Sequence, residues 1–351
     1  MQKWKEPVSL RRKTDFSFVP NVFGKRGQCL LTPKCSIETE VMKTKNLTSI
    51  KHQFTQFVSD VQQHICDELE AVEGTEKFLI EDWEREGFGG GSTRIIADGD
   101  VIEKGGVNVS TVGGPLPAAI QKKFEVPESE FFATGVSLVI HPRNPFVPTV
   151  HANYRYFELY DNETGELRDQ WFGGGADMTP YYLFPEDATH FHQVHKEVCD
   201  RFDPKYYPIF KAECDAYFYN HHREEARGIG GLFFDYQRPD ENRSAENLFE
   251  FAKACGFAFT DAYIPILKKR KDIKYNEEHR KWQEIRRGRY VEFNLIHDRG
   301  TLFGLKTKGR IESILMSLPP RVRWEYDHQP EPGSPEAELV EHLKPIDWIN
   351  Y

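Results

Sequence analysis

The chain has 351 residues, which is long enough for a large domain with a substantial buried core. Charged residues make up 29% and hydrophobic residues 39%, and no apolar run approaches the roughly 20 residues of a membrane-spanning helix. The formal net charge of −9 argues against nucleic acid as the main partner, and the six cysteines form no C-x-x-C pair.

Positive charge is concentrated at the start of the sequence. Residues 1–45 contain ten lysines and arginines against four acidic residues, a net charge of +6, so the remaining residues carry −15. We expect residues 1–47 to form a basic arm of a cytoplasmic protein. A mitochondrial or plastid transit peptide is the alternative, although such peptides are poor in acidic residues such as Glu6 and Asp15.

The first half of the chain is predicted to be a helix followed by strands. Apolar residues recur at helical spacing over residues 48–70. Two short strands are predicted within residues 92–110 around an Asp98-Gly99 turn, a third over 133–141 and a fourth from His151.

The second half is predicted to be mainly helical. Alternation of aromatic and polar residues predicts one further strand over 289–298. The predicted helices cover residues 186–202, 207–228, 245–271 and 310–320. Strands joined by short turns imply antiparallel pairing, so the predicted fold class is α+β. We expect one domain over 48–326, followed over 327–351 by a Pro-rich tether with a short C-terminal helix.

The stretch "HANYRYFELY" carries an unusual row of polar side chains. At the two-residue period of a strand, His151, Asn153 and Arg155 point to one face and Tyr154 to the other. At about 3.3 Å per residue, His151 and Arg155 lie about 13 Å apart, which suits a wide, charged ligand.

Other motifs are weaker signals. The glycine clusters "GFGGGST", "FGGGAD" and "GIGGLFFD" do not match a nucleotide-binding loop. The thirteen histidines include no H-E-x-x-H motif, so a metal site has no spacing to support it. Lys308 and Arg310 come where a helix is predicted to begin, a position that suits an anion.

Four long strings resemble the family of oxygen-dependent coproporphyrinogen III oxidases. They are "GVSLVIHPRNPFVPTVHANYRYFE", "WFGGGADMTPYY", "RGIGGLFFDY" and the run from "RGRYVEFNLIHDRGTLFGL" through "GRIESILMSLPP" to "WEY". The resemblance extends from about Phe78 to Tyr326. It implies a large antiparallel sheet covered by helices on both faces. It also implies oxidative decarboxylation of two propionates of coproporphyrinogen III to vinyl groups, giving protoporphyrinogen IX in haem biosynthesis.

The resemblance also implies site residues and partners. His151 matches the proton donor, and the substrate-binding positions are Ser137, Asn153, Tyr154, Arg155, Lys308, Gly309 and Arg310. Dioxygen is the electron acceptor, and no flavin, haem or nicotinamide is required. Residues Tyr290–Trp324 match a homodimer interface. Positions proposed as metal ligands in bacterial relatives correspond to His141, His151, His192 and His222, so a divalent metal is a secondary expectation.

A tetracarboxylate macrocycle has definite chemical needs. Arg155, Arg227 and Arg310 are expected to bind its carboxylates, since a guanidinium binds a carboxylate in bidentate fashion. Its inward pyrrole N–H groups need an ionised carboxylate, for which Asp177 is the first candidate and Asp298 the second. Two other functions compete with this one: a non-catalytic tetrapyrrole carrier and a metal-dependent oxidase that uses a histidine cluster.

Overall fold

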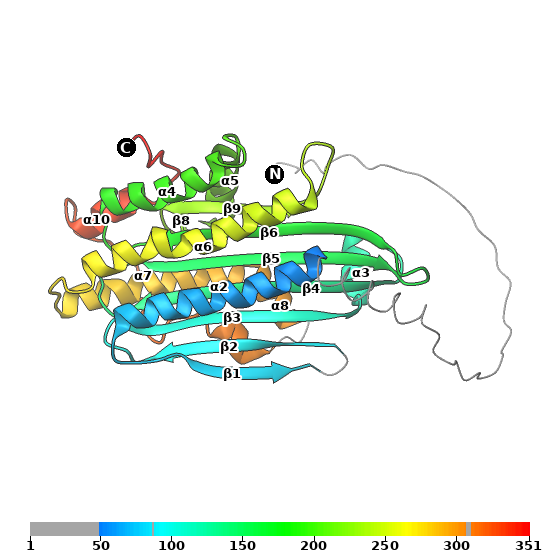
Figure 1. Ribbon diagram of the computed structural model, residues 1–351. Helices are drawn as coiled ribbons and strands as arrows, with labels where there is room; N and C mark the ends of the chain where they lie inside the picture. Colours follow the sequence, from blue (N-terminus) through cyan, green and yellow to red (C-terminus); the bar gives the residue numbers. More distant parts are fainter. Residues whose placement is uncertain (1–48, 86–87, 307–309) are drawn as a thin grey trace, which may run out of the picture. The chain divides into compact units, whose positions relative to one another are not determined.

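The computed structural model describes residues 49–85, 88–306 and 310–351, so the predicted basic arm lies outside the described residues. Figure 1 gives the element labels. The helices are α2 (Ile50–Glu73), α3 (Ala118–Phe124), α4 (Pro185–Asp200), α5 (Tyr206–Tyr217), α6 (Ala245–Arg270), α7 (Glu277–Ile296), α8 (Arg299–Lys306), α9 (Ile311–Leu315) and α10 (Pro335–Glu341). The strands are β1 (Leu79–Glu84), β2 (Gly89–Ala97), β3 (Ile102–Pro115), β4 (Ser129–Pro142), β5 (Thr149–Asp161), β6 (Leu167–Thr179), β7 (Tyr219–Asn220), β8 (Glu225–Ala226) and β9 (Gly230–Gln237).

One seven-stranded antiparallel sheet organises the domain. Its strand order is β1-β2-β3-β4-β5-β6-β9, so neighbours in the sheet are mostly neighbours in the sequence. The predicted turn at Asp98-Gly99 joins β2 to β3, and Asp98 has a φ of 60° there. The predicted α+β fold class with antiparallel pairing is confirmed.

Helices cover the sheet on both faces. On one face, α2 and α6 pack across the strands, as Figure 1 shows, and the buried Phe54 of α2 lies 5.5 Å from the ring of Tyr156 on β5. Tyr154 points to the same face, where its hydroxyl donates to the carbonyl of Cys255 in α6. On the other face lies α7, whose Tyr290 packs edge-on against His141 of β4 with the rings 5.3 Å apart. The polar side chains of β5 point to this second face.

The strand predicted over residues 289–298 is wrong, because residues 289–296 form the second half of α7. Asn276 begins the helix with a capping box that pairs it with His279. The helical period was hard to recognise because α7 buries charged residues: Arg287 is 0% exposed and donates to Glu103. The helix predicted over 207–228 also ends early, at Tyr217, and the β7–β8 hairpin follows it.

The residues after 326 pack against the domain. Ser334 caps α10, the short C-terminal helix, through the backbone N–H of Ala337. Trp348 is fully buried and donates from its indole N–H to the carbonyl of Ile229. Among the described residues, none of the helices is both long and apolar enough to cross a membrane.

Buried histidines make stability depend on pH. Burial lowers the pKa of His192 to about 3 and that of His195 to about 4. An unfolded histidine titrates near 6.5, so below that pH the unfolded chain binds protons that the folded chain does not, and stability falls. Each histidine contributes a slope of up to about 1.4 kcal/mol per pH unit.

We therefore expect His195→Leu to flatten the decline in the free energy of unfolding between pH 6.5 and 4.5. Urea unfolding at pH 7.5, 6.0 and 5.0 measures the slope. The control is His52→Leu, because His52 is exposed and water surrounds its imidazole in both states. Equal slopes for the wild type and His195→Leu would contradict the prediction.

Candidate functional site

A row of polar side chains crosses the second face of the sheet. Asn153 of β5 pairs with Ser137 of β4, and Ser137 pairs with Asn108 of β3. Directly opposed residues in an antiparallel sheet point to the same face, so these three side chains form one row. Ser137 is exposed and Asn153 is partly buried, so this part of the row is accessible to a ligand.

Glycines lie beside the polar row on the neighbouring strand. Gly173 and Gly175 of β6 pair with Arg155 and Asn153. A Cβ at Gly173 would lie 2.8 Å from Nε of Arg155, and one at Gly175 would lie 2.1 Å from the carbonyl oxygen of Leu232. Since β6 has no side chain at these two positions, its backbone is bare there, and we call this surface the glycine floor. The Arg155 and Asp235 side chains lie across its Gly173 end.

Along β5, the side chains of His151, Asn153 and Arg155 form a second row, here called the β5 row. Three charged or titratable side chains meet at its His151 end. His151 and Asp177 are paired residues of β5 and β6, and Nδ1 of His151 lies 2.8 Å from Oδ1 of Asp177. Arg227, which follows β8, donates to Asp177 from Nη2 at 2.6 Å and 2.8 Å and from Nε at 3.2 Å. Arg227 therefore binds the Asp177 carboxylate in bidentate fashion.

The cluster is closed to solvent except at His151. The side chains of Asp177 and Arg227 are each 2% exposed, whereas that of His151 is 20% exposed. Burial alone would raise the pKa of Asp177, but the charge of Arg227 and the hydrogen bond from His151 outweigh it and hold the pKa below its usual value. Asp177 is thus ionised near neutral pH.

Arg227 does not lie where a substrate carboxylate could reach it. Its guanidinium carbon is 4.0 Å from the ring centroid of Phe218 and 4.8 Å from those of Tyr290 and Phe293. Burial lowers the pKa of Arg227, but Asp177 reverses the effect and raises it. The expectation that Arg227 binds the rim of a macrocycle does not fit this enclosed position.

Arg155 lies at the opposite end of the β5 row. Its Nη2 is 2.9 Å from Oδ2 of Asp235 on β9, and its side chain is 38% exposed. Arg299, at the start of α8, approaches the same carboxylate at 3.9 Å. Arg155 is therefore an accessible cation that is held in place by a neighbouring acid.

Asp298 lies in the turn between α7 and α8. Its Oδ1 accepts a hydrogen bond from the hydroxyl of Tyr217 at 2.9 Å, and its Oδ2 accepts one from the backbone N–H of Thr301 at 2.6 Å. Tyr217 stacks on Phe233 of β9, which pairs with Gly175, so Asp298 lies beside the glycine floor. Asp298 is only partly buried, in contrast to Asp177.

Other predicted site residues lie elsewhere. Because the side chain of Tyr154 is on the opposite face, only its backbone can line the polar row. Arg310 precedes α9 and forms an ion pair with Glu81 at the β1 edge of the sheet. Lys308 and Gly309 lie outside the described residues.

The four histidines proposed as metal ligands do not converge. His141 contacts Thr149 and the carbonyl of Ser317, and burial holds its pKa well below the usual value. His192 contacts Tyr207 and the carbonyl of Ile229. The fourth, His222, contacts His297 and Glu292. Over residues 49–85, 88–306 and 310–351, no group of three or more metal-ligating side chains is suited to a metal ion.

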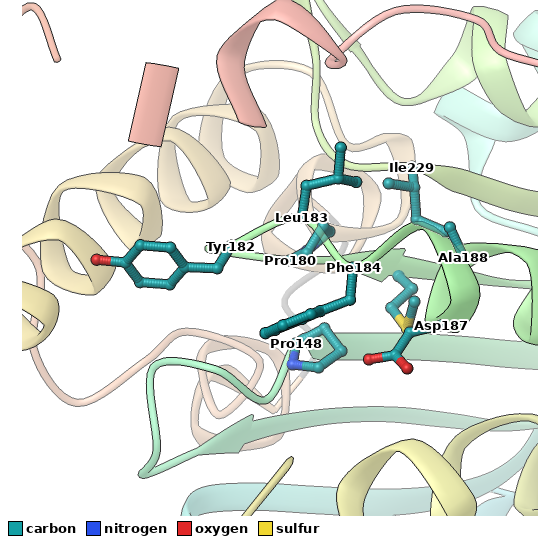
Figure 2. Close-up of a pocket in the computed structure, with 9 residues that line it drawn as sticks. Pro148, Pro180, Tyr182, Leu183, Phe184, Asp187, Ala188 and Ile229 are labelled. Atoms are coloured by element: carbon teal, nitrogen blue, oxygen red, sulfur yellow. The ribbon is translucent and has the colours of Figure 1, made fainter. Parts of the chain in front are cut away.

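The pocket drawn in Figure 2 is not part of this site. It encloses about 10 Å³, close to the space of a single water molecule. Its lining is mostly apolar, and its one acid, Asp187, is bound by Arg270 at 2.8 Å. A second depression, of about 310 Å³, lies between α5 and the C-terminal segment near Lys211 and Asp347, also away from the polar row.

Comparison with known proteins assigns the chain to a family. The family model described as coproporphyrinogen III oxidase matches residues 53–348. The chain belongs to the coproporphyrinogen III oxidase family. Coproporphyrinogen-III oxidase 1, chloroplastic, of Arabidopsis thaliana is 50% identical over 323 residues, covering 88% of this chain and 82% of its own length. The chloroplastic oxygen-dependent enzymes of Glycine max and Nicotiana tabacum are 49% and 47% identical, covering 88% and 87% of this chain and 82% and 79% of their own lengths. The resemblance noted from the sequence motifs is confirmed.

The sequence did not point to every residue of this site. Asn294 of α7 accepts a hydrogen bond from Nη1 of Arg227 at 2.9 Å, and it lies within the segment 289–298 for which a strand was predicted. Asp235 was not singled out, although the string "GGLFFDY" places it two residues after Phe233. A helical reading of residues 277–296 would have put Tyr290 and Asn294 on one face, four residues apart.

Proposed function

We propose that this chain catalyses the oxidative decarboxylation of two propionates of coproporphyrinogen III to vinyl groups, with dioxygen as the electron acceptor. The product is protoporphyrinogen IX, a precursor of haem. Each decarboxylation removes two electrons and a proton from the propionate carbon next to the ring and releases CO₂. The observation that carries the proposal is the row His151–Asn153–Arg155 beside the glycines of β6.

The polar face suits a wide ring with acidic side chains. A macrocycle on the glycine floor would place a propionate within reach of Arg155, whose pairing with Asp235 it would replace. Asp298 is the better placed acceptor for pyrrole N–H groups, because it is partly exposed whereas the side chain of Asp177 is 2% exposed. His151 supplies the accessible proton-transfer group next to the floor.

The test is aerobic incubation of the purified chain with coproporphyrinogen III, followed by analysis of the products. We expect protoporphyrinogen IX and CO₂, with oxygen consumed. Tight binding of the porphyrinogen without oxygen uptake would instead support the carrier function.

We propose that the reaction requires no metal. The predicted ligands His141 and His192 each contact protein groups through both ring nitrogens. Ligation needs a free lone pair, so these contacts would have to break before metal could bind. We expect full activity after exhaustive chelation; loss of activity that returns on addition of manganese, iron or copper would support the metal-dependent oxidase.

We propose a homodimer formed through Tyr290–Trp324. The described part of this segment exposes Leu295, Ile296, Leu305, Ile311 and Trp324, each at least 39% exposed. Exposed large apolar side chains gathered in one segment are typical of an interaction site. We expect light scattering to give twice the chain mass and Ile296→Glu to give a monomer. Ile209→Glu is the matched control, since Ile209 is similarly exposed (49%) but belongs to α5. An unaffected dimer in Ile296→Glu would count against this surface.

We propose a plastid as the compartment. The sequence favoured the cytoplasm, but the three relatives are named chloroplastic, which supports the alternative of import through residues 1–47. Incubation of the full chain with isolated chloroplasts should leave it protected from external protease. Deletion of residues 1–47 should abolish protection, and protection without them would argue against the basic arm as the import signal.

A further inference from the structure

We propose that Asn294 is a positioning residue for the reaction: through Arg227 and Asp177 it fixes the proton on Nδ1 of His151 and directs Nε2 toward the substrate face. The expected effect on kcat rests on the proposed function, whereas the hydrogen bonds described next do not depend on it. Side chains from the sheet, from the segment after β8 and from α7 form one chain of hydrogen bonds, Asn294–Arg227–Asp177–His151.

The direction of each hydrogen bond follows from chemistry. Arg227 has only donors, so the Asn294 atom 2.9 Å from its Nη1 is the carbonyl oxygen. Ionised Asp177 has only acceptors, so Nδ1 of His151 carries a proton when it contacts Oδ1 at 2.8 Å. Nδ1 keeps this proton in both charge states of the imidazole. The proton that His151 exchanges is therefore the one on Nε2.

Two hydrogen bonds of this chain meet at Oδ1 of Asp177. This oxygen accepts from Nη2 of Arg227 at 2.6 Å as well as from His151 at 2.8 Å. A rotation of the guanidinium would shift the carboxylate and with it the imidazole. The Phe218 and Phe293 rings confine the plane of Arg227, but only the bond from Nη1 to Asn294 fixes its far end among the contacts of the described residues.

Because both partners are buried, loss of the hydrogen bond between Asn294 and Arg227 is expected to have a large effect. Asn294 is 4% exposed and Arg227 is 3% exposed, so water cannot readily replace a lost partner. Removing the amide leaves Nη1 of Arg227 without an acceptor. Rotation of the guanidinium toward another acceptor then lowers the free energy. The expected result is a misplaced His151 rather than a missing one, and misplacement of about 1 Å costs up to about 10²-fold in rate.

Gln283 offers a matched control on the same helix. It is a fully buried amide of α7 that also accepts from an arginine in an ion pair, Arg280 with Glu103. That network ends at the β3–β4 side of the domain and does not include His151 in any described contact. A purely structural effect of losing a buried amide would appear in both variants.

The experiment compares the wild-type chain with Asn294→Leu and Gln283→Leu. Imidazole ¹⁵N NMR, with His151→Gln to assign the signal, reports the tautomer of His151 without substrate. The dependence of kcat on pH reports its proton transfer, and binding of the unreactive oxidised macrocycle coproporphyrin III reports the site. For Asn294→Leu we expect a mixed tautomer, kcat reduced between about 10-fold and 10²-fold with a shifted pH profile, and binding within about twofold.

The outcomes separate the positioning role from the proposed reaction. An unchanged tautomer and pH profile in Asn294→Leu would overturn the inference, as would equal changes in Gln283→Leu. If the wild type is inactive but Asn294→Leu alone loses the Nδ1–H tautomer, the positioning role stands and the proposed reaction fails. If Asn294→Leu does not fold, Asn294→Ser, which keeps a smaller acceptor, replaces it with the same criteria.

Discussion

Asp177→Asn is expected to lower kcat by about 10²- to 10⁴-fold while changing KM by less than about threefold, because the carboxylate is buried and contacts His151, the accessible member of the pair. An amide can present its N–H₂ group to His151, which would move the imidazole proton from Nδ1 to Nε2. In the neutral imidazole, Nε2, the ring nitrogen that faces the substrate, would then carry a proton and could not accept one. Steady-state kinetics with coproporphyrinogen III measure both constants.

The same substitution removes the counter-ion of Arg227, which is buried on every side. Breaking a buried ion pair costs about 3–5 kcal/mol, so Asp177→Asn is best examined beside Asp177→Asn/Arg227→Met, in which no buried charge remains unpaired. We expect the double variant to recover the wild-type Tm but not its kcat. Recovery of kcat with Tm would show that Asp177 serves stability alone.

Arg155→Ala is expected to lower kcat/KM by about 10- to 100-fold, mainly through KM. A charge-assisted hydrogen bond to a carboxylate is worth about 1.5–3 kcal/mol, and its loss leaves the propionate without this partner, while Asp235 keeps its contacts with Arg299 and the backbone N–H of Tyr236. Arg155→Lys should recover only part of this loss, since lysine cannot bind a carboxylate in bidentate fashion.

The matched control for Arg155 is Arg238→Ala. Arg238, which follows β9, is likewise paired with an aspartate, Asp169, and its side chain is 46% exposed. Its guanidinium carbon lies 5.2 Å from the ring centroid of Trp171, which pairs with Phe157 beyond the Arg155 end of the row, so its loss should change KM much less. A similar rise in KM in both variants would show that the effect comes from general surface charge and not from a substrate contact.

Much of the fold could be predicted because the sheet is local in sequence. Each strand from β1 to β6 pairs with the next one along the chain, so turns and alternating patterns carry the topology. The prediction failed where tertiary burial overrides local pattern: α7 places Arg286 and Arg287 in the interior, and their ion pairs with Glu225 and Glu103 make a buried face look polar.

The candidate site could be predicted only as far as one strand. Period-two alternation correctly put His151, Asn153 and Arg155 on one face and Tyr154 on the other. The contacts of Arg227 and Asn294 depend on how the β7–β8 hairpin and α7 meet over that face, and no local spacing encodes that meeting. Side chains that act through another residue are therefore the ones that sequence motifs leave unassigned.

The burial of Trp348 has a consequence for the folding of the domain during translation. Its indole closes over Ile229, next to the glycines that begin β9, and Leu343 accepts a backbone hydrogen bond from Ala226. These contacts join residues more than 100 positions apart, so they form only after residue 348 has left the ribosome. Until then Ile229 and Ala226 lack these contacts. A stalled nascent chain ending near residue 340 should be far more sensitive to protease than the released protein.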